Sequence, residues 1–183
     1  MRFRNSTVVI FTCFVIFIAG ACGMRGDDVL GTWDETNGAF KIRITAYDEK
    51  LGIPPQRFYY TFEASGPDST QWHEIMTCRR KNVLGTPHEQ VKFVANHSAY
   101  VFLADKFATT IDAGRTWSVW DGYRIRRDMN INYGWIYIRS VSISADGAGE
   151  MVVAEASLSM AEFSEARDVA RLRTSDYGQH WTR

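Results

Sequence analysis

The sequence predicts an all-β fold, in which antiparallel meanders form two or three propeller-blade-like units as an incomplete propeller or a β-sandwich. Two observations predict it. Runs of alternating apolar and polar residues, separated by turn residues, fill most of the chain after residue 38. An octapeptide at residues 110–117 also returns in closely similar form at residues 174–181. A turn that recurs between predicted strands indicates a repeated hairpin unit.

The first predicted strands follow one another with short connections. Residues 40–47 alternate apolar and polar side chains, as a half-buried strand does. Aromatic and β-branched residues at 57–64 predict a second strand, and residues 71–79 a third. Residues 90–94 and 99–103 lie on either side of the turn residues 96–98 and predict a hairpin.

The second half of the chain continues this pattern. Residues 107–111 lead into the first octapeptide and residues 117–120 lead out of it. Residues 135–143 and 151–154 predict another hairpin, across a turn at 146–149. Residues 158–170 differ, because Met160, Phe163 and Ala166 recur at a spacing of three and predict one or two turns of helix, or a loop.

The octapeptide has residues suited to a tight turn. The Asp112 carboxylate is placed to accept backbone N–H groups, and the Thr110 hydroxyl to do the same more weakly. Gly114 permits a positive φ, and Trp117 supplies a large apolar surface to bury. Thr116 completes the pattern. All five residues are therefore predicted to be structural.

The second octapeptide keeps most of these positions. It is predicted to use Thr174, Asp176, Gly178 and Trp181 in the same way, with His180 in place of threonine. Residues 65–72 form a degenerate third copy, in which the aspartate is one place late and the glycine is missing.

The amino-terminal residues predict export. Arg2 and Arg4 precede an apolar run at residues 8–18, which is typical of a signal peptide at residues 1–21. Cys22 follows small residues, as in a bacterial lipobox, and is the predicted lipidation site. Residues 22–30 would then be the lipidated cysteine and a tether, and residues 31–183 a single β domain. The alternative is ordinary cleavage after Ala21, which would give a soluble periplasmic or secreted protein.

Charge and cysteine content narrow the function classes. Loss of residues 1–21 leaves 19 Lys and Arg residues against 21 Asp and Glu residues, which gives no electrostatic reason to expect nucleic acid as a partner. Cys78 would remain as an unpaired cysteine on a predicted strand, and we expect it to be an inert core thiol rather than one activated by the basic residues 79–81. The histidines lack metal-ligand spacing, and the sequence predicts neither metal nor cofactor.

A group of arginine and aromatic residues is the predicted partner-binding region. Arg, Tyr and Trp are the residue types that most often carry binding energy at protein interfaces. The alternative is that they form the solvated and packed faces of a strand and loop. The charged segment 158–170 is a second candidate contact region. The predicted binding residues are Tyr123, Arg124, Arg126, Arg127, Tyr133 and Trp135.

The repeated turn resembles the Asp-box, or bacterial neuraminidase repeat, of β-propeller proteins. In that family the turn lies on the outside of the fold, away from any active site, so the resemblance implies a structural role. A sialidase site requires a complete propeller, which is longer than this chain. We therefore expect no enzymatic activity, and a glycan-binding module is only the third alternative.

The chain as a whole resembles small bacterial lipoproteins related to immunity proteins of type VI secretion lipase effectors. The resembling segments include residues 40–47, 72–77, 91–94, 116–121 and 174–181. The resemblance implies a lipoprotein on the periplasmic side of the outer membrane, held by its lipid, which binds and blocks a secreted lipase. A structural or assembly lipoprotein of the envelope without a toxin partner is the alternative.

Overall fold

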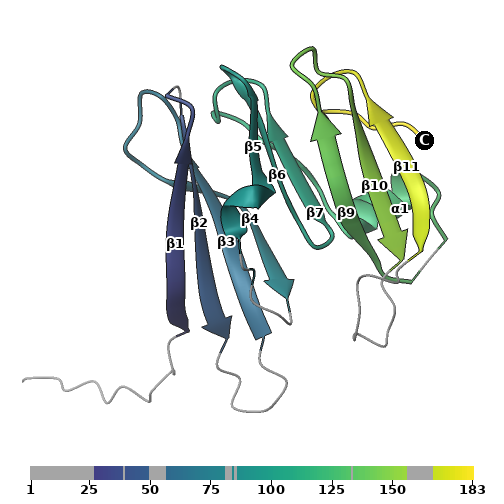
Figure 1. Cartoon of the computed structure of the whole chain (residues 1–183), viewed down its shortest axis with the longest axis horizontal. Helices are drawn as coiled ribbons and strands as arrows, with labels where there is room; N and C mark the ends of the chain where they lie inside the picture. Colours follow the sequence, from purple (N-terminus) through teal and green to yellow (C-terminus); the bar gives the residue numbers. More distant parts are fainter. Residues whose placement is uncertain are drawn as a thin grey trace, which may run out of the picture.

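The computed structural model describes residues 27–38, 40–49, 57–80, 84, 86–132, 134–155 and 167–183. The strands of these residues form three antiparallel sheets that lie next to one another (Figure 1). Each sheet is a meander, since strands adjacent in sequence are neighbours in the sheet. The prediction of an all-β fold made of blade-like meanders is therefore confirmed.

The first sheet contains β1 (Asp28–Thr36), β2 (Lys41–Glu49), β3 (Arg57–Ser65) and β4 (His73–Arg80), in that order. Strands β2 to β4 were predicted within two residues at each end. The prediction of a tether reaching residue 30 was wrong at its end, because β1 begins at Asp28 and pairs with β2, with a register shift between Val29 and Gly31. Strand β1 carries few apolar side chains, so its sequence shows little alternation.

The second sheet contains β5 (Val91–Ala95), β6 (Ser98–Leu103), β7 (Lys106–Thr110) and β8 (Ser118–Trp120). A short 3-10 helix, η1 (Pro87–Gln90), precedes it. The predicted hairpin of β5 and β6 is confirmed, with its turn at Asn96 and His97.

The third sheet contains β9 (Ile136–Ile143), β10 (Gly149–Glu155) and β11 (Asp168–Thr174). A single bridge joins Arg173 to Thr182 at the outer edge of β11. The predicted helix or loop at residues 158–170 was wrong at its end, because β11 begins at Asp168; there Ala170 and Leu172 alternate with exposed residues and pair with β10. Residues 158–166 lie outside the described residues.

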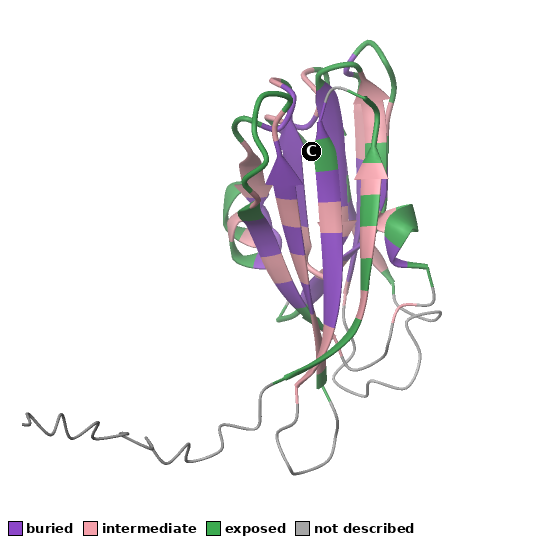
Figure 2. Cartoon of the chain, turned by 90° about the vertical axis from the view of Figure 1, so that its left-hand side faces the viewer, coloured by how far each residue is buried: buried purple, intermediate pink, exposed green. Residues whose placement is uncertain are grey.

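The middle sheet packs on both of its neighbours. Ala99, Val101 and Leu103 of β6 belong to a core cluster shared with the first sheet. Tyr100 of the same strand and Phe107 of β7 belong to a second cluster, shared with the third sheet. Burial accordingly changes from residue to residue along the strands in Figure 2. The three sheets are thus stacked face to face through two apolar layers.

The two octapeptides occupy equivalent places, each directly after the third strand of its sheet. Asp112 accepts hydrogen bonds from the Thr110 hydroxyl (2.8 Å), the Thr116 N–H (2.9 Å) and the Thr116 hydroxyl (2.6 Å). The Thr110 hydroxyl in turn accepts from Gly114 N–H (3.1 Å). These contacts close the turn between β7 and β8.

The second turn repeats this network. Asp176 accepts from the Thr174 hydroxyl (2.8 Å) and the His180 N–H (3.0 Å), and Thr174 accepts from Gly178 N–H (2.9 Å). Trp181 is 4% exposed and meets Phe107 edge to face, so this turn also fastens the third sheet to the second.

Each turn is also tied to the first hairpin of its own sheet. Ala113 N–H donates to the His97 carbonyl, and Tyr177 N–H to the Gly147 carbonyl, both at 2.9 Å. The degenerate copy at residues 65–72 also follows the third strand of its sheet, β3, and leads into β4, but here Ser65 donates to the Ser69 carbonyl instead. Position in the meander is therefore shared by all three turns, whereas the aspartate network belongs to two.

Candidate protein-binding surface

The predicted binding residues that the structure describes lie at the end of the sheets that is remote from the aspartate turns. Strand β7 runs from the turn at Ala104 and Asp105 to the octapeptide that begins at Thr110. The chain returns along β8 and enters helix α1 (Gly122–Asp128), so α1 lies near the Ala104 turn. Ile138 N–H donates to the Ala104 carbonyl (2.7 Å) and holds β9 beside the same turn.

Helix α1 is fixed by its cap and its buried face. The Asp121 carboxylate accepts from Arg124 N–H at 2.7 Å, which satisfies an N–H group that the helix start leaves unpaired. Ile125 and Met129, four residues apart, are buried in the cluster between the second and third sheets. A helix this short depends on such contacts, since its intrinsic stability is marginal.

Arg126 connects the helix to the strand that follows it. Its Nε donates to the Gly122 carbonyl (3.3 Å) and its Nη1 to the Gly134 carbonyl (2.7 Å). The second contact holds the backbone next to Trp135. Tyr123 and Trp135 are 65% and 66% exposed, the highest values among the described aromatic residues. Two exposed rings are therefore presented on backbone that is held in place.

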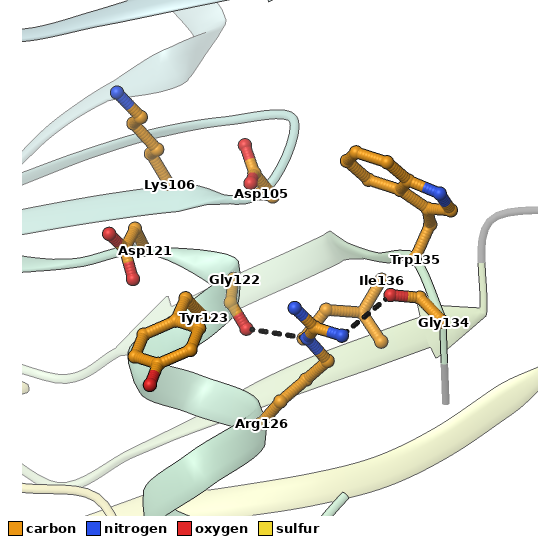
Figure 3. Close-up of a pocket in the computed structure, with 9 residues that line it drawn as sticks. All are labelled: Asp105, Lys106, Asp121, Gly122, Tyr123, Arg126, Gly134, Trp135 and Ile136. Atoms are coloured by element: carbon orange, nitrogen blue, oxygen red, sulfur yellow. Dashed lines mark hydrogen bonds between the residues drawn. The ribbon is translucent and has the colours of Figure 1, made fainter. Parts of the chain in front are cut away.

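These residues surround an open pocket of about 200 Å³ (Figure 3). Asp105 and Trp135 lie on one side of it, and Tyr123 and Arg126 on the other. The pocket combines aromatic rings with groups of both charges. Its lining residues are Asp105, Lys106, Asp121, Gly122, Tyr123, Arg126, Gly134, Trp135 and Ile136.

Most charged groups of the pocket already have partners within the chain. Lys106 Nζ donates to the Thr77 carbonyl (2.7 Å), which binds the second sheet to the first. Asp121 caps α1, and Arg126 bridges Gly122 and Gly134. These charged groups hold the pocket lining in place through contacts within the chain. A lining fixed in this way suits recognition of another molecule.

The structure places some of the predicted binding residues in the pocket and others outside it. Tyr123, Arg126 and Trp135 line the pocket. Arg127 lies outside it, with its guanidinium 5.9 Å from the Tyr123 ring centre and 2.7 Å from Asp128, and that hydrogen bond lowers the pKa of Asp128.

Arg124 does not line the pocket. The Arg124 guanidinium stacks 3.7 Å from the ring centre of Trp120 and donates to the Val119 carbonyl (2.9 Å). It therefore packs against its own domain. Tyr133 lies outside the described residues.

Sequence reasoning missed three charged residues of the pocket: Asp105, Lys106 and Asp121. Asp121 carried a usable signal, because an aspartate before the Ile125 and Met129 spacing of four is typical of a capped helix. Asp105 and Lys106 carried none, since they reach the pocket only through the packing of the second sheet on the third.

Cys78 lies away from this surface, at the interface of the first two sheets. It is 2% exposed, and its thiol lies 3.4 Å from the Leu103 carbonyl. Burial raises the pKa of Cys78 to about 12. The expectation of a buried core thiol is confirmed, and the effect of burial on this pKa outweighs the lowering by Lys106 and Arg80.

Comparison with known proteins adds no assignment to this geometry. The described part of the chain contains no group of His, Cys, Asp and Glu residues arranged to hold a metal ion. It also contains no helix with the length and apolar composition needed to cross a bilayer. No family model, no curated protein and no solved structure matches the chain.

Proposed function

We propose that this chain is an envelope-anchored lipoprotein that binds a protein partner without transforming it. The most specific form of the proposal is an immunity protein that neutralises a lipase delivered by type VI secretion. Lipidation of Cys22 would hold the β domain on the periplasmic side of the outer membrane, where such a lipase acts on lipid. The export signal and the resemblance described above support this form.

One observation carries the binding role: two largely exposed aromatic rings, Tyr123 and Trp135, stand beside a pocket on backbone fixed by α1 and Arg126. Exposed tryptophan and tyrosine on a rigid support lose little conformational entropy on binding. The surface also lies at the opposite end of β7 from the aspartate turn, so binding would leave the hydrogen-bond network of that turn undisturbed.

We expect the gene adjacent to the one for this chain to encode the lipase, and the test is protection of cells that produce this lipase in the periplasm. The full-length protein should protect them and co-purify with the lipase. Trp135→Ala should weaken binding about 30-fold, as for a central interface tryptophan. Ile111→Ala is the matched control, because Ile111 is also exposed but lies at the end of the aspartate turns.

Two outcomes would contradict the proposal. One is failure of the wild-type protein to protect the cells and to bind the lipase. The other is loss of binding in Ile111→Ala with retention in Trp135→Ala, which would place the partner on the other end of the sheets. Co-purification with an outer-membrane assembly protein instead would favour the structural lipoprotein.

A further inference from the structure

We infer that the pocket between α1 and the Ala104 turn receives a cationic side chain, an arginine or a lysine, from the protein partner. This inference rests on the proposed binding function and specifies its chemistry. It depends on two features of the pocket: its aromatic walls and its one carboxylate that has no partner.

The aromatic walls suit a cation. Trp135 and Tyr123 stand on opposite sides of the opening, each about two-thirds exposed. The face of an aromatic ring attracts an ammonium or guanidinium group through the ring quadrupole, and tryptophan does so most strongly. The described part of the chain makes this contact with its own arginines, at Arg43 over Trp72 and at Arg124 over Trp120, and Arg127 lies 5.9 Å from the ring centre of Tyr123.

The pocket lining carries two carboxylates, Asp105 and Asp121, and two cations, Lys106 and Arg126, and among these only the Asp105 carboxylate has no partner in the part of the chain that the structure describes. Among the described residues, no hydrogen bond or ion pair reaches the Asp105 carboxylate. The Lys106 ammonium group is directed to the Thr77 carbonyl, and the Arg126 guanidinium to the Gly122 and Gly134 carbonyls. The Asp105 side chain packs against Gly122 at the start of α1, so its carboxylate lies within the pocket beside the helix that presents Tyr123.

The experiment uses amino-acid amides as probes and the indole N–H resonance of Trp135 as the readout. Nitrogen-15-labelled protein is titrated with N-acetyl-arginine amide, N-acetyl-lysine amide and N-acetyl-glutamate amide. The Trp135 signal is identified by its loss in Trp135→Phe. We expect the arginine and lysine amides to shift this resonance, and the glutamate amide to leave it in place.

Two variants locate the charge that the cation meets. Asp105→Asn keeps the shape of the side chain and should weaken arginine-amide binding about fivefold. Glu89→Gln removes an exposed carboxylate from η1, outside the pocket, and should leave binding unchanged. Unchanged resonances elsewhere in the spectrum show that each variant is folded.

The inference is overturned if the glutamate amide binds as well as the arginine amide, if neither cationic probe shifts Trp135, or if Asp105→Asn binds the arginine amide like the wild type. These outcomes are separate from the fate of the proposed function. A lipase that binds the wild type and Asp105→Asn equally, but not Trp135→Ala, would keep the proposed function and reject the cationic contact.

Discussion

The Nδ1 atom of His180 lies 2.7 Å from Oδ2 of Asp176. The Thr116 hydroxyl holds the same position in the other turn, 2.6 Å from Oδ2 of Asp112. In both turns the backbone N–H of that residue also donates to Oδ1. An imidazole thus replaces a hydroxyl in an otherwise unchanged network, which explains why the histidine at this position is compatible with the turn.

Replacing the turn aspartates is predicted to destabilise the domain. Asp112→Ala removes the acceptor of three hydrogen bonds and leaves N–H and hydroxyl donors unpaired in a partly buried turn. We expect the free energy of unfolding to fall by about 2–3 kcal/mol, measured by urea titration. Asp176→Ala should behave alike.

Asp68→Ala is the matched control for this prediction. Asp68 lies in the degenerate turn, is 87% exposed, and contacts Arg115 at 3.2 Å. Its loss should change the free energy of unfolding by less than about 0.5 kcal/mol. Equal effects of Asp68→Ala and Asp112→Ala would show that the aspartate network does not distinguish the turns.

The same carboxylates predict an acid-sensitive contribution to stability. Burial raises their pKa values, but hydrogen bonds outweigh it: those from Thr116 and Thr110 lower the pKa of Asp112, and those from His180 and Thr174 lower that of Asp176. A pKa depressed in the folded state gives stability that is present above about pH 4, the ordinary value for aspartate, and is lost as the pH falls further.

Unfolding measured at neutral and acidic pH tests this sign. The wild type should lose more stability on acidification than Asp112→Ala or Asp176→Ala, because each variant lacks one of the depressed carboxylates. If the free energy of unfolding falls equally in wild type and variants on acidification, protonation of Asp112 and Asp176 does not cause the acid sensitivity.

The strands predicted correctly are those whose core-facing residues are apolar. In β2, for example, Ile42 and Ile44 alternate with polar residues, and both are fully buried. Strand β1 was missed because it is an edge strand whose side chains are exposed or half-buried, with Trp33 as its one aromatic residue. Pairing with β2, rather than its own apolar pattern, determines its conformation.

The residues of the candidate site were likewise predicted only in part. Residue type was enough to select Tyr123, Arg126 and Trp135, since exposed aromatic residues and arginine are typical of interfaces. It was not enough to separate Arg126 from Arg124, which lie two apart on α1 and point to different neighbours. That separation follows from helix α1, which was not predicted from the sequence.

The glycine of the second turn is predicted to be required for packing as well as for backbone conformation. Gly178 has φ +82°, and a Cβ atom there would lie 2.7 Å from Cζ of Phe107. Gly38 has φ +87° with nothing within 4 Å of the same position. Gly38→Ala should therefore cost about 1 kcal/mol for the backbone, and Gly178→Ala at least about 1 kcal/mol more for the collision with the Phe107 ring. Thermal or urea unfolding that gives equal losses would contradict the packing role.

Anchoring by lipid is predicted to depend on Cys22, which lies outside the described residues. Cys22→Ser removes the thiol that would carry the lipid, and we expect the protein to move from the membrane fraction to the soluble periplasmic fraction. Cys78→Ser is the control, since Cys78 is buried in the β domain. Recovery of Cys22→Ser in the membrane fraction would contradict lipidation and favour another means of attachment.

The arginines of α1 are predicted to separate into a structural and a binding residue. Arg124 stacks on Trp120, donates to the Val119 carbonyl and lies 3.5 Å from Asp128, so Arg124→Ala should lower the free energy of unfolding by about 1–2 kcal/mol. Arg127 is 61% exposed beside Tyr123, and Arg127→Ala should leave stability unchanged while weakening partner binding. Urea unfolding of both variants measures the effect on stability, and their co-purification with the lipase measures the effect on binding. Loss of stability in Arg127→Ala with none in Arg124→Ala would reverse the assignment and place the binding residue on the Trp120 side of the helix.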